Sequence, residues 1–258
     1  MRERAFPAYL GGVYLFLYLP IVILMILSFN KSGLPTAWGG FSAEWYGRLL
    51  HSPKIIAAAA NSLIVAVIST VIASVLGTLL ALGVERSRRS SAIDALLFTP
   101  MIIPDIVLAI ALLSFFTLIR LTLGLQSIIL AHVVFNIAFV CAVVRARLKS
   151  FDWSLEEASR DLGAGAVTTF RLVTLPLILP AIVVGALLAF TLSIDEFIIA
   201  YFTAGAGQSS TTLPMQIYAM LRFGVTPEIN AMATIVLFVS FVLVLSAQRL
   251  NRGRIPGA

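Results

Sequence analysis

The chain alternates between long apolar runs and short polar segments. Six runs of about 20 or more mostly apolar residues are each long enough to cross the hydrocarbon core of a bilayer as a helix. These runs cover residues 8–29, 57–83, 94–119, 125–144, 177–202 and 230–248. Helices fit the pattern better than membrane strands, because the runs are continuous and do not alternate between apolar and polar positions. The sequence predicts an all-α membrane protein with six transmembrane helices in a single domain, 1–258.

Charged residues are scarce and unevenly placed along this pattern. They make up 12% of the chain, whereas a typical soluble domain has about 25%. Thirteen of the 18 Lys and Arg residues fall in segments that six alternating spans place on one side. These are Arg2, Arg4, Arg86, Arg88, Arg89, Arg145, Arg147, Lys149, Arg160, Arg171, Arg249, Arg252 and Arg254. Because basic residues concentrate on the cytoplasmic side, we predict that both termini are cytoplasmic. The net charge of +6 follows this orientation, and we expect no nucleic-acid partner.

The two long loops on the opposite side cover residues 30–56 and 203–229. The basic residues before the first apolar run resemble the start of a secretory signal. However, that run is too long for a signal peptide and contains Pro20, and no A-x-A-like cleavage site follows it. We therefore interpret it as a retained first helix.

Signatures of enzymes and metal sites are absent from the sequence. There is no G-x4-G-K-[ST] segment, so the chain is not expected to bind ATP through a P-loop. No H-E-x-x-H or Cys/His cluster indicates a metal, and no G-x-S-x-G elbow indicates a serine nucleophile. The single Cys141 lies in an apolar run and is interpreted as a core residue. We expect neither catalysis nor a cofactor bound by this chain.

Three acidic residues interrupt the apolar runs: Asp105, Asp195 and Glu196. A charge at the bilayer centre costs at least about 2.5–3.5 kcal/mol, so such residues usually face a water-filled cavity or a partner. Asp105 follows Pro104 about 11 residues into its run, roughly 16 Å along a helix. Asp195 and Glu196 are about 18 residues into theirs, roughly 27 Å along, and could instead mark a hydrated helix end.

An acidic pathway through the membrane favours cationic solutes. Coulomb attraction is strongest where water is excluded, and no basic residue within the runs is placed to neutralise all three acids. Phe116 and Tyr201 are aromatic candidates for cation–π contacts along the same pathway, although each could equally pack against lipid or other helices. Adjacent helical residues point about 100° apart, so we expect only one of Asp195 and Glu196 to face the pathway.

The polar segment 150–176 has the pattern of a helix-turn-helix between two spans. Ser154 and Glu157 have the spacing of a capping box, which predicts a helix start. Gly163 is placed to end that helix in a left-handed turn. A second short helix is expected over about 167–173, and Pro176 allows a new helix to begin after it.

Within this segment, Glu157-Ala158-Ser159, Gly163 and Val173-x-Leu175-Pro176 form the pattern E-A-S-x3-G-x9-V-x-L-P. It resembles the EAA loop of the membrane subunits of bacterial ABC importers, E-A-A-x3-G-x9-I-x-L-P. The departures, Ser for Ala and Val for Ile, are conservative. The resemblance implies the type I ABC importer permease fold. It also implies that an ATPase couples through Glu157, Ala158, Ser159, Gly163, Leu175 and Pro176.

Most of the chain resembles one membrane subunit of the spermidine/putrescine-type importers. The matching stretches are Leu19-Pro20, Ser28-Phe29-Asn30, residues 103–108, residues 191–197 and residues 225–234. The family's usual Asp-Asp pair is here Asp195-Glu196. The resemblance implies a small cationic solute, above all a polyamine. Another cationic or zwitterionic solute remains an alternative, as does a secondary transporter that works without an ATPase.

The same resemblance implies a set of partners in the bacterial inner membrane. A second, homologous permease forms a heterodimer with this chain. Two copies of a cytoplasmic ATPase bind ATP and Mg²⁺ and contact the coupling loop. A periplasmic substrate-binding protein delivers the solute to the outer loops.

Overall fold

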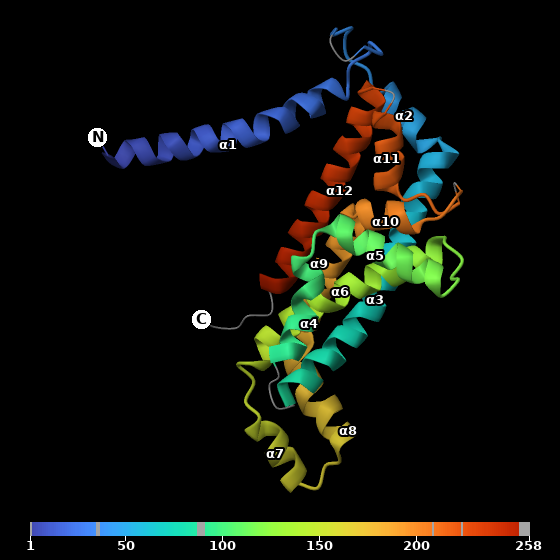
Figure 1. Cartoon of the computed structure of the whole chain (residues 1–258). Coiled ribbons are helices and arrows are strands. Elements are labelled where there is room, and N and C mark those ends of the chain that lie inside the picture. The colour runs from blue at the N-terminus through green and yellow to red at the C-terminus, as the bar shows by residue number, and fades with distance from the viewer. Residues whose placement is uncertain (1, 35–36, 87–90, 208, 223, 253–258) are drawn as a thin grey trace. The chain divides into compact units, whose positions relative to one another are not determined.

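The computed structural model describes residues 2–34, 37–86, 91–207, 209–222 and 224–252, so the predicted cytoplasmic residues Arg88, Arg89 and Arg254 lie outside it. The described chain is built of helices (Figure 1). They are α1 (Arg2–Leu27), α2 (Glu44–Leu50), α3 (Pro53–Arg86), α4 (Ser91–Ile102), α5 (Asp105–Leu118), α6 (Leu125–Leu148), α7 (Ser154–Asp161), α8 (Ala166–Thr169), η1 (Phe170–Thr174), α9 (Leu175–Asp195), α10 (Ile198–Thr203), α11 (Leu213–Leu221) and α12 (Pro227–Arg252). They divide into two compact units, Met1–Ile56 with Gln216–Ala258, and Ala57–Met215.

Four described helices are long and apolar enough to cross a membrane on their own. Their spans are Tyr9–Leu27, Pro53–Arg86, Leu125–Leu148 and Ala166–Asp195, and a fifth is counted if the bent pair α4–α5 forms one span. Helix α12 contains a shorter apolar stretch, Pro227–Val242. The chain is thus a helical, multi-pass membrane protein, as the apolar runs predict.

In the first unit, α12 packs against both α1 and α2, and a buried asparagine organises the loop between α1 and α2. The side-chain amide of Asn30 donates to the carbonyls of Leu34 and Ala37, at 3.2 and 2.9 Å. Its side-chain oxygen accepts from the Gly39 N–H at 2.9 Å, and its own carbonyl accepts from the Trp45 indole at 2.8 Å. Every polar group of this fully buried side chain is therefore used.

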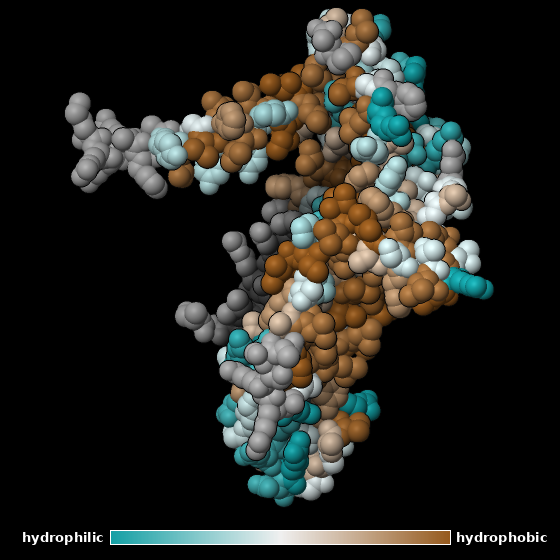
Figure 2. Space-filling model, in the orientation of Figure 1, coloured by the Kyte–Doolittle hydropathy of each residue, from teal (hydrophilic) through white to brown (hydrophobic). Residues whose placement is uncertain are grey.

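In the second unit, α6 is the central helix, and α4, α5, α9 and α10 pack against it. Val140, Val144 and Ile178 are fully buried in the cluster between α6 and its neighbours. Helix α3 also approaches α6 closely, because a Cβ added at Gly77 would lie 2.9 Å from the Val140 Cβ. Figure 2 shows hydrophobic residues along these helices and hydrophilic residues gathered at the end formed by α7 and α8.

The predicted helix 94–119 is wrong as a single element. The structure ends α4 at Ile102 and begins α5 at Asp105, with a bend of 109° between the two helices. Pro104 takes φ −56° and ψ 136°, which is extended rather than helical. A proline also drives the residue before it out of the α region, so the chain turns at Ile103–Pro104 while staying apolar.

The predicted helix 177–202 also differs from the structure at both ends. It stops at Asp195, because Glu196 is extended (φ −69°, ψ 125°), and the chain resumes helical structure as α10. At its other end there is no separate short helix before Pro176. Residues Ala166–Asp195 form one continuous 30-residue helix.

A π-helical turn, η1, lies just before Pro176 in this continuous helix. The Leu175 N–H bonds to the Phe170 carbonyl, five residues back. In a regular α-helix the ring of Pro176 would collide with the carbonyl four residues earlier. The wider turn relieves this contact, and the helix continues through the proline instead of ending there.

Candidate functional site

The two helix breaks carry the three acidic residues. Asp105 is the first residue of α5, directly after the bend at Pro104, and its side chain is exposed. Asp195 is the last residue of α9, also exposed, and Glu196 lies in the extended link to α10. Breaks free backbone groups that a continuous helix would satisfy, which is tolerated in membranes beside a cavity or other protein.

The Glu196 carboxylate caps the start of α10. Its Oε1 accepts from the Ile199 N–H at 2.7 Å, and its Oε2 accepts from the Ala200 N–H at 2.9 Å. These two amides have no partner within α10, and an acidic group is stabilised at the positive end of a helix. Glu196 therefore has a structural task that its neighbour Asp195 lacks.

A buried histidine on α6 lies next to this cap. His132 is 1% exposed, and its Nε2 lies 3.5 Å from Glu196 Oε2. Its Nδ1 lies 2.6 Å from the Ser193 hydroxyl on α9, which in turn lies 3.2 Å from the Ser69 hydroxyl on α3. Three helices are thus joined by one polar contact chain beside Glu196. The sequence gives no signal for the pairing of His132 with Glu196, because the two residues are brought together only by the packing of α6 against α9 and α10.

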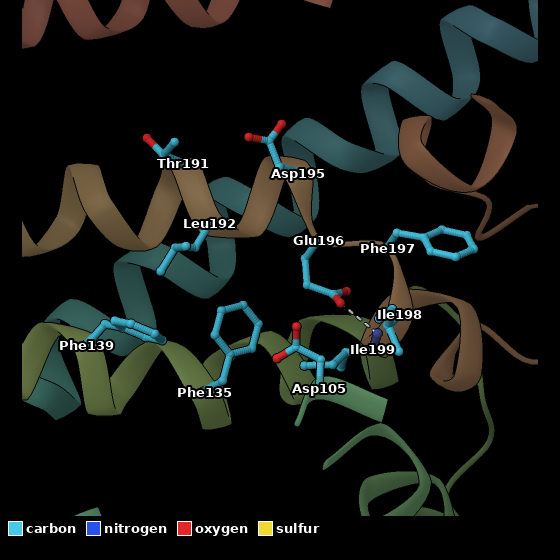
Figure 3. A pocket seen from close by; sticks show the side chains of 10 residues that line it. All are labelled: Asp105, Phe135, Phe139, Thr191, Leu192, Asp195, Glu196, Phe197, Ile198 and Ile199. Carbon is cyan, nitrogen blue, oxygen red and sulfur yellow. Dashed lines mark hydrogen bonds between the residues drawn. The ribbon is translucent and has the colours of Figure 1, made fainter. Parts of the chain in front are cut away.

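A pocket of about 560 Å³ brings the three acids together (Figure 3). Its lining residues come from α5, α6, α9, the link after α9, and α10. They are Asp105, Phe135, Phe139, Thr191, Leu192, Asp195, Glu196, Phe197, Ile198 and Ile199. Figure 3 shows the Glu196 carboxylate directed toward α10 and the Asp195 carboxylate pointing to the other side of the end of α9. The pocket therefore combines carboxylates with aromatic rings.

The two aromatic residues expected along the pathway lie outside the pocket lining. Phe116 is 4% exposed and belongs to a buried cluster with Leu112, Phe135 and Ile199. Tyr201 is half exposed on α10, with its ring 5.4 Å from that of Phe197. The rings that do line the pocket, at Phe135, Phe139 and Phe197, were not singled out from the sequence, because aromatic residues are frequent in every apolar run.

The segment 150–176 contains the predicted first helix and turn, but the second arm is the start of the continuous helix Ala166–Asp195 and not a separate short helix. Helix α7 begins at Ser154 as expected, but not through a capping box, because the N-cap residue is Trp153, which makes no side-chain cap hydrogen bond. Instead Asp152 accepts from the Ser154 N–H at 3.0 Å, and hydrogen bonds with Ser154 hold the pKa of the Asp152 carboxyl below its ordinary value. Gly163 adopts φ +85°, the left-handed turn that its position predicts.

The residues of the EAA-like pattern differ in exposure. Glu157 and Ala158 are exposed on α7, and Pro176 is exposed on α9. Leu175 is half-buried, and the Ser159 hydroxyl lies 3.1 Å from the hydroxyl of Thr169 on α8. The structure therefore joins the two arms of the turn through Ser159 and leaves Glu157 exposed.

The buried acid of this segment is Glu156, which sequence reasoning missed. Its side chain is 6% exposed and accepts from Arg86 and from Thr174, each at 2.5 Å. It lies one position before the motif glutamate, and its partners lie 70 and 18 residues away in sequence. The one signal in the sequence is the pair of adjacent acids after Leu155, because adjacent residues of a helix point in different directions and one of the two can face inward.

No group of three or more His, Cys, Asp or Glu side chains suited to hold a metal ion occurs within the part of the chain that the structure describes. Within the described residues, Glu196 is held by backbone amides, Glu156 by Arg86, and Glu85 and Asp94 by Arg145. The carboxylates of the pocket can attract a cation electrostatically.

Over residues 73–255 the chain matches the family of binding-protein-dependent transport system inner membrane components. The chain belongs to this family. The permease is 40% identical over 251 residues to the spermidine/putrescine transport system permease protein PotC of Escherichia coli (strain K12), covering 96% of this chain and 94% of PotC. It is 40% identical over 252 residues to the putrescine transport system permease protein PotI of the same organism, covering 92% and 89%.

The permease also shares its fold with a solved importer. A chain of a bacterial ABC transporter involved in the import of the acidic polysaccharide alginate superposes with a TM-score of 0.77 at 18% identity. The superposition covers 99% of the permease and 97% of that chain. The fold of ABC importer membrane subunits is thus retained although few residues are shared.

Proposed function

We propose that this chain is a transmembrane subunit of an ATP-driven importer and forms half of the pathway for a polyamine such as spermidine or putrescine. The observation that carries the proposal is the pocket whose lining includes Asp105, Asp195 and Glu196 together with aromatic rings. The names of the relatives, which transport spermidine and putrescine, support the choice of solute.

A polyamine matches the chemistry of this pocket. It carries several ammonium groups separated by apolar methylene segments. The carboxylates of Asp105 and Asp195 attract the ammonium groups, and the rings of Phe135, Phe139 and Phe197 suit methylenes and cation–π contacts. A sugar would gain little from this combination, and an anion would be repelled by it.

Six spans with both termini in the cytoplasm are part of the proposal. The bent pair α4–α5 would supply one span and α12 the last, alongside the four long apolar helices. The distribution of basic residues supports a cytoplasmic position for α7 and α8 in the bacterial inner membrane. On this topology α2 and α11 lie in the outer loops, where a periplasmic binding protein would dock.

The ATPase would bind the surface of α7 and α8. Leu162 in the turn, Val167 on α8 and Leu172 in η1 are each more than 70% exposed, and Glu157 on α7 is exposed as well. Exposed apolar side chains at a polar end of a protein indicate a protein contact. Two ATPase copies would bind ATP and Mg²⁺, one docking here and the other on a second, homologous permease.

The deciding experiment is uptake of labelled spermidine by vesicles that contain the permease with the partners encoded beside it. ATP-dependent uptake that unlabelled putrescine competes away, and that amino acids and sugars do not, is expected. Uptake without ATP would contradict the importer. ATP-dependent complex assembly without spermidine uptake would contradict the polyamine and direct the search to other cationic or zwitterionic solutes.

A further inference from the structure

A buried carboxylate, that of Glu156, connects the inner face of α7 to the membrane-spanning helices. Glu156 Oε1 accepts from Arg86 Nη2, at the end of α3, and from the Thr174 hydroxyl, in η1. Arg160, one turn further along α7, lies 3.4 Å from the other oxygen, Oε2. Thr174 is fully buried, so its hydroxyl has no access to water as an alternative partner.

The surroundings of Glu156 make this attachment stiff. The Arg86 guanidinium lies 5.6 Å from the centre of the Trp153 ring, and Trp153 packs edge-on to Phe151 at 4.9 Å. Both aromatic residues contact the buried cluster of α3, α6 and α9 that contains Val144. The start of α7 is thus set into the same core as the transmembrane helices, and only its outer face is free.

The two neighbouring glutamates on α7 consequently point in different directions. Glu157 is exposed toward a partner, whereas Glu156 points inward to α3 and η1. A push on α7 from outside reaches two transmembrane helices at once through the Glu156 carboxylate. One of them, α9, ends at Asp195 in the pocket, and the other, α3, contacts Ser193 near the same end through Ser69.

We propose that Glu156 is a positioning residue that transmits movement of α7 to α3 and α9, through its ion pair with Arg86 and its hydrogen bond with Thr174. The inference rests on the proposed coupling to an ATPase but assigns the transmission to a residue outside the EAA-like pattern. Glu157 contacts the ATPase, and Glu156 conveys the contact inward. Breaking the Glu156 contacts uncouples hydrolysis from transport without preventing assembly.

The first test measures the local attachment and needs no substrate. In the importer assembled with its partners, hydrogen exchange of residues 154–161 is followed by mass spectrometry for wild type and Glu156→Gln. Exchange about tenfold faster is expected in the variant, because a buried ion pair has been broken. Glu44→Gln is the matched control, since it breaks an exposed pair with Arg48 at 2.7 Å and should leave exchange of α7 unchanged. Unchanged exchange in Glu156→Gln would overturn the proposal whatever the solute is.

The second test measures transport per ATP hydrolysed in vesicles. Glu156→Gln is expected to lower spermidine uptake per ATP by about two- to thirtyfold, the range typical of residues that carry coupling. A residue that only supports the fold would lower uptake and hydrolysis in parallel, so a parallel loss would overturn the proposal. Absence of spermidine uptake in the wild type would count against the polyamine assignment, and the exchange experiment would still decide the role of Glu156.

A conservative pair of variants separates the loss of the hydrogen bond from misfolding as the cause of reduced transport. Thr174→Val removes the hydroxyl that donates to Glu156 while keeping the shape of the side chain, and Thr174→Ser keeps the hydroxyl. Reduced uptake per ATP is expected for Thr174→Val only. Equal behaviour of the two variants would show that the hydrogen bond carries no coupling.

Discussion

Asp195 and Glu196 are adjacent acids with different environments, because a helix ends between them. Both carboxylate oxygens of Glu196 accept hydrogen bonds from backbone amides of α10, and the carboxylate lies beside the buried His132. Asp195 is exposed on the last turn of α9 and does not cap a helix. The sequence predicts that only one of the two faces the pathway, and the geometry favours Asp195 for the direct contact with a cation.

Replacing Asp195 by asparagine should therefore weaken substrate binding and leave assembly intact. A charge-assisted hydrogen bond is worth roughly 1.5–3 kcal/mol, so the apparent KM for spermidine should rise by about tenfold or more. Thr191→Val is the matched control, since Thr191 lines the same pocket and its hydroxyl bonds only to its own helix, at Leu187. Kinetics of uptake would measure both variants, and an unchanged KM in Asp195→Asn would return this acid to the role of a hydrated helix end.

At the scale of elements, the apolar runs predicted where helices lie but not where they break. Apolar residues continue through Ile102 and Ile103 and again after Glu196. The length of the apolar runs alone therefore predicts one helix where the structure has α4 and α5, and one where it has α9 and α10. Pro104 gave a local signal for its break. Asp195 and Glu196 indicated a helix end only as one of two alternatives, because the cap that Glu196 forms on α10 exists only after folding.

The turn between α7 and α8 shows the opposite case, in which one residue determines an element. Gly163 at φ +85° is predictable from the sequence, because few other residues adopt this conformation without strain. The contacts of Glu156 with Arg86 and Thr174 were not predictable, because only the packing of α3 and η1 against α7 brings these residues together.

Gly163→Pro should uncouple transport while the permease still inserts and assembles. Proline fixes φ near −65° and removes the N–H that Gly163 donates to the Arg160 carbonyl at 2.8 Å, a local cost of roughly 1–3 kcal/mol. Spermidine uptake at least about tenfold below wild type is expected, with normal amounts of complex. Gly165→Pro is the control two residues away, since Gly165 already has φ −70°. Normal uptake by Gly163→Pro would refute the coupling role of this turn.

For the whole molecule, the membrane class and the importer fold followed from run lengths and one spaced motif, and the family match supports both. The acids of the pocket were also identified in advance, because charge inside an apolar run is rare and costly. The rings that accompany them were not, since Phe135 and Phe139 differ from lipid-facing aromatics only in their position on α6.

The predicted orientation can be tested with two single cysteines. The native Cys141 is 2% exposed and should not react, so Leu162→Cys, at an 89% exposed position, and Leu34→Cys, at a 63% exposed position, report on opposite sides. A membrane-impermeant maleimide should label Leu34→Cys in intact cells without their outer membrane, and Leu162→Cys only in inverted vesicles. Labelling of both from the same side would contradict the six-span topology.

The uninterrupted helix from Ala166 to Asp195 gives the molecule a mechanical advantage. Thirty residues at 1.5 Å each make a rod about 45 Å long. Tilted by about 5° around its coupling end, such a lever swings its far tip by about 4 Å, more than the length of a hydrogen bond. A small angular change at α7 therefore corresponds to a displacement of several ångströms at Asp195, at the other end of the helix.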